Sequence, residues 1–213
     1  MNIGIIGSGP VGQTLAAGFL KHGHEVAIGT GHPDKLAEWG RKNDRARILS
    51  FAEAAAFGDV LILAVGGAVA LDVLGQIGAA ALGAKIVIDA TNPIGGGPPE
   101  KGVLSFFTTL KDSLMERLQK AYPKARFVKA FNSVGAGQMV NPTFAGGRPT
   151  MFICGDDYDA KARTGVLLDQ LGWDVADMGA APSARAIEPL CMLWCIPGIA
   201  NGDWSPHAFK LLK

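Results

Sequence analysis

A chain of 213 residues is long enough to bury one sizeable hydrophobic core, with room for a small appendage. The composition, 48% hydrophobic and 18% charged with 29 glycines, is typical of a packed globular protein and excludes a disordered one. The 20 basic and 19 acidic residues nearly balance, so we expect no binding to nucleic acid or to a membrane surface.

The chain begins MNIGIIGSGP, which has no basic segment and reaches a glycine early, so we do not expect a signal peptide. No stretch approaches the roughly 18 apolar residues of a membrane span. Cys154, Cys191 and Cys195 form no CxxC pair and are odd in number, which favours thiols in a reducing cytoplasm. Cys191 and Cys195 share a helix face, but no His or Asp adjoins them, so we expect no metal site.

Short apolar runs alternate with helical patterns, as in βαβ units around a parallel sheet. The predicted strands are residues 2–7, 24–29, 59–65, 84–90 and 125–130, with a short extra strand at 47–49. The predicted helices are residues 10–22, 33–43, 51–57, 67–81 and 105–121. Ser50 and Glu53 have the spacing of a capping box, which supports a helix start there.

The alternation continues beyond residue 141 on a smaller scale, and no low-complexity linker separates the two parts. It predicts a strand at 150–155, a helix at 157–171, a strand at 174–178 and a helix at 183–196. We therefore predict a doubly wound α/β fold over residues 1–148, with a short C-terminal α/β extension (149–213) packed on it. Loop 91–102, rich in glycine and proline, is the most irregular segment, and the sequence leaves open whether it closes over a ligand, since glycine content alone does not show motion.

Gly7, Gly9 and Gly12 form a G-x-G-x-x-G motif directly after a predicted strand and at the start of a predicted helix. Gly7 permits the tight turn, Gly9 lets backbone approach a pyrophosphate, and Gly12 lets helix and strand pack closely. The helix N-terminus presents free N–H groups to the anion. The sequence therefore predicts a Rossmann-type site for a dinucleotide.

The stretch GTGHPDKL (29–36) follows the second strand, where a carboxylate would bind the adenosine ribose of NAD. The nearby acids are misplaced, because Glu25 lies at the other end of that strand and Asp34 inside the next helix. Groups for a 2′-phosphate are present: the Thr30 hydroxyl, the Gly31 N–H, His32 before a helix starting at Pro33, and Lys35. We predict a moderate preference for NADP; the alternative is a polar loop without a ligand.

The predicted strands end in small, glycine-rich stretches: AVGG, beginning Ala64, Val65 and Gly66, then DATNPIGG (89–96) and AFNSVGAG (130–137). Asp89 is their one ionisable group. Such walls suit a flat ring system and indicate that the cofactor, without a catalytic side chain, carries the chemistry. Asn92 and Asn132 either bind a carboxamide or cap their own turns. His22, His24 and His207 are poor catalytic candidates.

IGIIGSGPVGQTLAAGFLKHGHEVAIGT, DVLILAV, VIDATNP and KAFNSVGAGQM resemble the coenzyme F420-dependent NADP oxidoreductase family, and GGRPTMFICGDD and EPLCMLW continue the likeness. The resemblance implies direct hydride transfer between NADP(H) and a deazaflavin or flavin, and a homodimer formed through the apolar last helix. It places the pyrophosphate on Ser8, Gly9, Pro10, Val11 and Gly12, the 2′-phosphate on Thr30, His32 and Lys35, and the nicotinamide near Val65, Gly66, Asn132 and Ala136. The chain departs from the family where Gly31 or His32 replaces an Arg, and at Gly66 and Gly67, where bulkier residues are common.

Two other functions are compatible with the sequence. Reductases of small imines or keto acids have a similar first half but usually append a large helical domain, whereas about 63 residues follow position 150 here. A non-catalytic NADP-binding redox sensor would equally lack an ionisable catalytic group.

Overall fold

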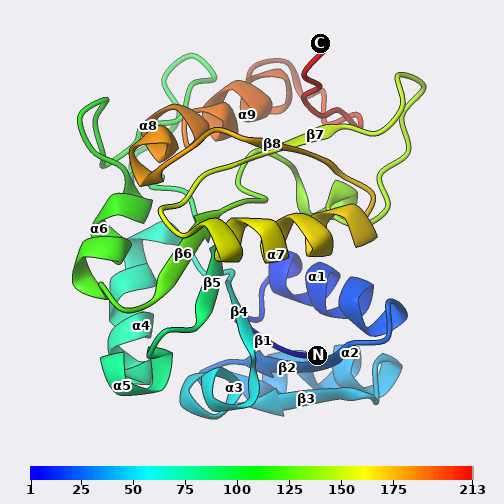
Figure 1. Ribbon diagram of the computed structural model, residues 1–213. Helices are drawn as coiled ribbons and strands as arrows, with labels where there is room; N and C mark the ends of the chain where they lie inside the picture. The colour runs from blue at the N-terminus through cyan, green and yellow to red at the C-terminus, as the bar shows by residue number, and fades with distance from the viewer. Residues whose placement is uncertain (213) are drawn as a thin grey trace.

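A six-stranded parallel sheet forms the centre of the protein in the computed structural model, which describes residues 1–212 (Figure 1). The strands are β1 (Asn2–Ile6), β2 (Glu25–Gly29), β3 (Ala46–Leu49), β4 (Val60–Leu63), β5 (Ile86–Asp89) and β6 (Arg126–Lys129). Their order, β3-β2-β1-β4-β5-β6, confirms the predicted Rossmann-type fold and the short strand expected at 47–49. The direction of winding reverses between β1 and β4, which is where such sheets bind ligands.

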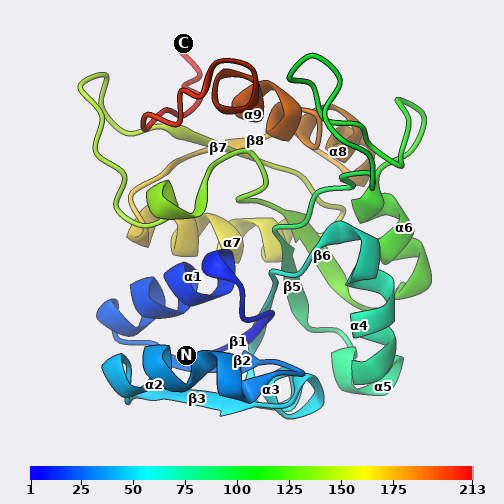
Figure 2. The same cartoon turned by 180° about the vertical axis from the view of Figure 1, so that it is seen from behind.

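Helices cover both faces of this sheet, as its largely apolar central strands require, and all residues of β4 and β5 are buried (Figure 2). On one face, α1 (Pro10–Lys21) and α7 (Tyr158–Gln170) share a core that includes Ile5 and Phe19. The other face carries α3 (Phe51–Phe57), α4 (Ala70–Ile77), α5 (Ala79–Leu82) and α6 (Leu114–Ala121). Ser50 and Glu53 form the expected capping box at the start of α3.

The C-terminal part gathers at the end of the molecule opposite β3 (Figure 1). It contains a two-stranded parallel sheet of β7 (Thr150–Ile153) and β8 (Asp174–Asp177), followed by the 3-10 turn η4 (Ala181–Ser183), α8 (Ala184–Ile187) and α9 (Leu190–Asn201). Trp173 is 2% exposed, lies in the same core as α1, and donates from Nε1 to the Met139 carbonyl at 2.9 Å. This part therefore completes the core of the first.

Four predicted helices differ from those observed. The predicted helix at 105–121 begins only at Leu114, because Ser113 caps it and residues 105–113 form a loop. The predicted helix at 67–81 is divided into the 3-10 turn η2 (Gly67–Val69), α4 and α5, with Gly78 at φ +84° between the last two. The predicted helix at 33–43 opens with the 3-10 turn η1 (Pro33–Leu36) before α2 (Ala37–Lys42).

The last predicted helix, 183–196, is also divided. The chain turns at Glu188 and Pro189 between α8 and α9, and α9 then continues past Pro197 to Asn201. Proline cannot donate the helical hydrogen bond, so Pro197 interrupts the bonding of α9 without ending it. The tail beyond α9 returns along β7, where the Thr150 N–H donates to the Phe209 carbonyl at 2.8 Å.

Candidate dinucleotide site

The glycine turn between β1 and α1 has the geometry that the motif predicts. Gly7 has a φ of +126°, and a Cβ there would overlap the Ala64 carbonyl. A Cβ on Gly12 would overlap the Gly7 carbonyl, so only glycine lets α1 pack this closely on the turn. Gly9 is exposed and has open space where a Cβ would lie.

The N-terminus of α1 beside this open space is available to an anion. Gly9 is the N-cap residue, it supplies no side-chain cap, and Pro10 occupies the first turn. The first N–H groups of a helix lack intrahelical partners and carry the positive end of the dipole. The turn therefore fits a pyrophosphate, which Ser8, Gly9, Pro10, Val11 and Gly12 would hold.

The glycine turn is bonded to the tip of β2, where the predicted 2′-phosphate site begins. The Ser8 and Thr30 hydroxyl groups lie 2.8 Å apart in a hydrogen bond, and the His32 N–H donates to Thr30 Oγ1 at 3.0 Å. Thr30 is only 6% exposed, so its hydroxyl mainly holds the loop in shape. It occupies the position where an acid would mark an NAD site.

The charged members of the predicted 2′-phosphate site, His32 and Lys35, are both exposed beside this strand tip. His32 caps η1 as expected, but η1 is a four-residue 3-10 turn. The dipole of so short a turn is small, which leaves the two side chains and the Gly31 N–H as the main candidates for holding a phosphate.

The three small-residue stretches meet at the carboxyl edge of β4, β5 and β6. A Cβ on Gly67 would overlap the Asn92 carbonyl, so the stretch after β4 lies directly against the stretch after β5. Asn92 Nδ2 donates to the Asn132 carbonyl at 2.8 Å, and Asn132 Nδ2 donates to the Ile187 carbonyl at 2.9 Å. The two asparagines thus join β5, β6 and the C-terminal part, and their contact with a nicotinamide stays a prediction, as does that of Ala64, Val65, Gly66 and Ala136.

A buried ionic cluster lies behind this edge, and sequence analysis missed two of its three members. Lys129 Nζ lies 2.7 Å from Asp89 Oδ2 and 2.9 Å from Glu188 Oε1. All three side chains are at most 1% exposed. The available signal was a lysine inside an apolar strand, which requires a buried partner.

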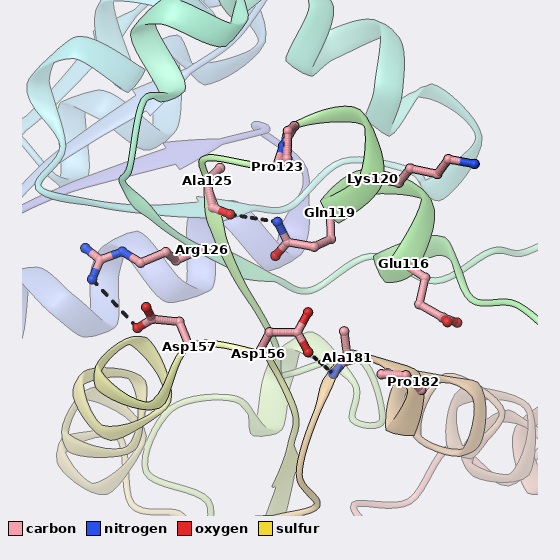
Figure 3. A pocket seen from close by; sticks show the side chains of 10 residues that line it. All are labelled: Glu116, Gln119, Lys120, Pro123, Ala125, Arg126, Asp156, Asp157, Ala181 and Pro182. Atoms are coloured by element: carbon pink, nitrogen blue, oxygen red, sulfur yellow. Dashed lines mark hydrogen bonds and ion pairs between the residues drawn. The ribbon is translucent and has the colours of Figure 1, made fainter.

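A cavity also lies elsewhere, between α6, β6 and the turn before α7 (Figure 3). It measures about 650 Å³, and none of the predicted site residues lines it. Its polar groups largely satisfy one another: Arg126 pairs with Asp157 at 3.7 Å, and Asp156 accepts from the Ala181 N–H at 2.9 Å.

Residues 1–212 contain no group of three or more His, Cys, Asp or Glu side chains placed to hold a metal ion. No helix among them combines the length and the apolar character needed to cross a bilayer.

Comparison with known proteins supports the dinucleotide site. Residues 2–93 match the family described as coenzyme F420-dependent NADP oxidoreductase. The chain is 34% identical to a protein from Arthrobacter sp. FB24 that has been assigned as an F420-dependent NADP reductase. Each of these two chains covers the other completely, and their TM-score is 0.92.

The chain spans only part of the length of its more distant relatives. The chain is 30% identical over 199 residues to metalloreductase STEAP3 of Rattus norvegicus, which is 92% of this chain but 38% of that protein. An imine reductase from Streptomyces aurantiacus has a TM-score of 0.67 at 16% identity, over 91% of this chain and 61% of that one. The latter likeness shows the fold alone.

Proposed function

Because the chain belongs to the coenzyme F420-dependent NADP oxidoreductase family, we propose that it transfers a hydride between NADP(H) and a flat acceptor, a deazaflavin or flavin. The observation that carries the proposal is the glycine turn with its free helix N-terminus, bonded at 2.8 Å to a strand tip that carries Thr30 in place of an acid.

The protein's own part in this reaction is to bind and orient. The α1 N-terminus holds the pyrophosphate, and Gly31, His32 and Lys35 hold the 2′-phosphate. Val65, Gly66, Asn132 and Ala136 form the wall against which the nicotinamide lies, with Ala64 and Asn92 beside them. The cofactor supplies the hydride chemistry when bound, so no side chain is needed as nucleophile or general base.

The acceptor is proposed from the family to which the chain belongs and from the shape of the edge. The stretches of chain that form this edge consist of small residues and glycines. Loop 91–113 lies against α9, where a Cβ on Gly102 would contact Ala200. A flat ring can lie against such backbone. We also propose a homodimer through the apolar surface of α9, where Leu193 is 56% exposed.

The cofactor part of the proposal is tested by thermal unfolding. NADP(H) is expected to raise the melting temperature more than NAD(H) at equal concentration, because the stabilisation by a ligand grows with the logarithm of its affinity for the folded state. Equal shifts would contradict the preference.

The acceptor part is tested by following NADPH oxidation with one acceptor at a time: a deazaflavin, FMN, FAD, a quinone, a ferric chelate and a cyclic imine. Rapid oxidation by the deazaflavin or a flavin is expected. Oxidation by the imine alone would favour the imine or keto acid reductases. Tight NADPH binding without oxidation by any acceptor would favour a redox sensor.

A further inference from the structure

We propose that the buried cluster of Asp89, Lys129 and Glu188 is a positioning cluster whose excess negative charge makes the site prefer the oxidised nicotinamide over the reduced one. The inference rests on the proposed function, because it takes the nicotinamide to lie at the edge formed by Asn92 and Asn132.

The cluster carries two acids for one base. Desolvation alone would lower the pKa of Lys129, but the Asp89 and Glu188 carboxylates outweigh it and raise that pKa, so the lysine stays a cation. With both acids ionised, the cluster has a net charge of about −1.

Both carboxylates also accept hydrogen bonds from other donors. Asp89 Oδ1 accepts from the N–H and the hydroxyl of Thr91, at 2.9 and 2.6 Å. Glu188 accepts from the first two N–H groups of α6, those of Leu114 and Met115, each at 3.0 Å. Donors of this kind bind a carboxylate in its charged form.

The cluster and the asparagine pair join the same three segments of the chain: the end of β5, the end of β6 and the end of α8. Lys129 Nζ also donates to the Thr91 carbonyl at 2.9 Å, and Thr91 is the neighbour of Asn92. Asn132 lies three residues after Lys129, and it donates to the carbonyl of Ile187, the neighbour of Glu188. A charge in the cluster is therefore held close behind the wall proposed for the nicotinamide.

The two forms of the cofactor differ by one positive charge on the nicotinamide ring. A fixed negative charge nearby stabilises the oxidised ring and leaves the neutral reduced ring almost unaffected. At an effective dielectric constant of about 20, a unit charge about 10–15 Å from the charged ring changes the binding constant of the oxidised cofactor on the order of tenfold.

The test compares the dissociation constants of NADP+ and NADPH, measured by titration of tryptophan fluorescence in the full chain. Asp89→Asn and Glu188→Gln each remove one negative charge with little change of shape. We expect the ratio Kd(NADP+)/Kd(NADPH) to rise at least threefold in both. Equal changes in the two constants would mean a purely structural role and would overturn the inference.

Two controls separate charge from packing. Glu188→Asp keeps the charge, so the ratio should stay constant even if both constants rise. Glu116→Gln removes a half-buried carboxylate of α6 that pairs with Arg185 outside the cluster, and should also leave the ratio unchanged.

The unmodified chain decides the question if neither neutral variant folds, because it should bind NADP+ more tightly than NADPH. Tighter binding of NADPH would overturn the inference. The failures are distinguishable: a chain that binds NAD(H) and not NADP(H) contradicts the proposed function. A chain that binds NADP(H) with a ratio insensitive to Asp89 and Glu188 contradicts the inference alone.

Discussion

His32 and Lys35 are the side chains on which NADP selection should depend, because both are exposed beside the tip of β2. Replacing either with alanine removes one charged or hydrogen-bonding contact with the 2′-phosphate, worth about 1 kcal/mol, or roughly a fivefold loss of affinity. We expect His32→Ala and Lys35→Ala each to weaken NADP+ binding by about that factor in calorimetric titrations and to leave NAD+ binding unchanged.

The matched control is Lys42→Ala, which removes a cation at the end of α2, where Lys42 pairs with Glu38 at 2.8 Å. This substitution should change neither the dissociation constant of NADP+ nor that of NAD+. A substitution that weakened the binding of NAD+ and NADP+ equally would show that the side chain it removes does not bind the 2′-phosphate.

Cys195 is the thiol that should react at neutral pH. Its hydrogen bond with Cys191, one helical turn away, outweighs the opposing effect of burial and, together with the charge of His207, lowers the pKa of Cys195 to about 7. The thiolate is the reactive form, so alkylation by iodoacetamide should accelerate as pH rises through about 7. Burial raises the pKa of Cys154 to about 12, and that thiol should stay unmodified in the native protein.

Mass spectrometry of peptides after alkylation at a series of pH values checks this order. Cys191→Ala removes the hydrogen bond and should move the midpoint for Cys195 upward, toward the ordinary range of a thiol. Faster labelling of Cys154 than of Cys195 in the folded protein would contradict the assignment.

At this scale, the sequence was informative for residues whose role is local. The roles of Gly7 and Gly12 follow from spacing, since turn and helix are adjacent along the chain, and their geometry is as predicted. The second partner of Lys129 was not predictable, because Glu188 is distant in sequence and lies beside Lys129 only in the folded chain. Contact with the cofactor remains a prediction for every proposed site residue.

Among the helices, α6 depends most clearly on its N-terminal cap. The buried Ser113 hydroxyl accepts from the Glu116 N–H at 3.2 Å and donates to the Glu116 carboxylate at 2.8 Å. Ser113→Ala removes both bonds and should lower the free energy of unfolding by about 1 kcal/mol. Denaturant unfolding measures this loss.

Ser205→Ala, at an exposed position in the tail, is the control and should change the same quantity by less than about 0.5 kcal/mol. An equal loss in both variants would show that Ser113 is not a significant cap.

Element type was predictable where hydrophobic periodicity was clear, and element boundaries were not. All eight strands described between residues 1 and 212 overlap the predicted ranges. The pattern was clearest for β4, because burial on both faces leaves an unbroken apolar run. The start of α6 was predicted nine residues too early, although Ser113 and Glu116 have the spacing of a capping box. The Glu188 carboxylate, which also caps this helix, comes from another part of the chain and could not be foreseen. The break at Glu188 and Pro189 reflects the missing N–H of Pro189, which removes a helical hydrogen bond although both residues keep helical backbone angles.

Across the whole molecule, the exposed apolar surface gives the final prediction. An apolar hollow of about 430 Å³ lies between the β7–β8 sheet and α9, and its wall includes Met178, Leu190 and Leu193. Met178 and Leu193 are 46% and 56% exposed. Contiguous apolar surface of this kind is typical of protein contacts.

We expect light scattering to give twice the chain mass of 22.2 kDa for the unmodified protein. Leu193→Glu should give the single mass, because a closed symmetric dimer would bury this charge in each copy of the same surface. Val166→Glu is the matched control, since Val166 is 58% exposed on α7 and away from the hollow, and it should leave the dimer intact. A single-chain mass for the unmodified protein would exclude the dimer, whereas loss of the dimer in Val166→Glu alone would place the contact on α7.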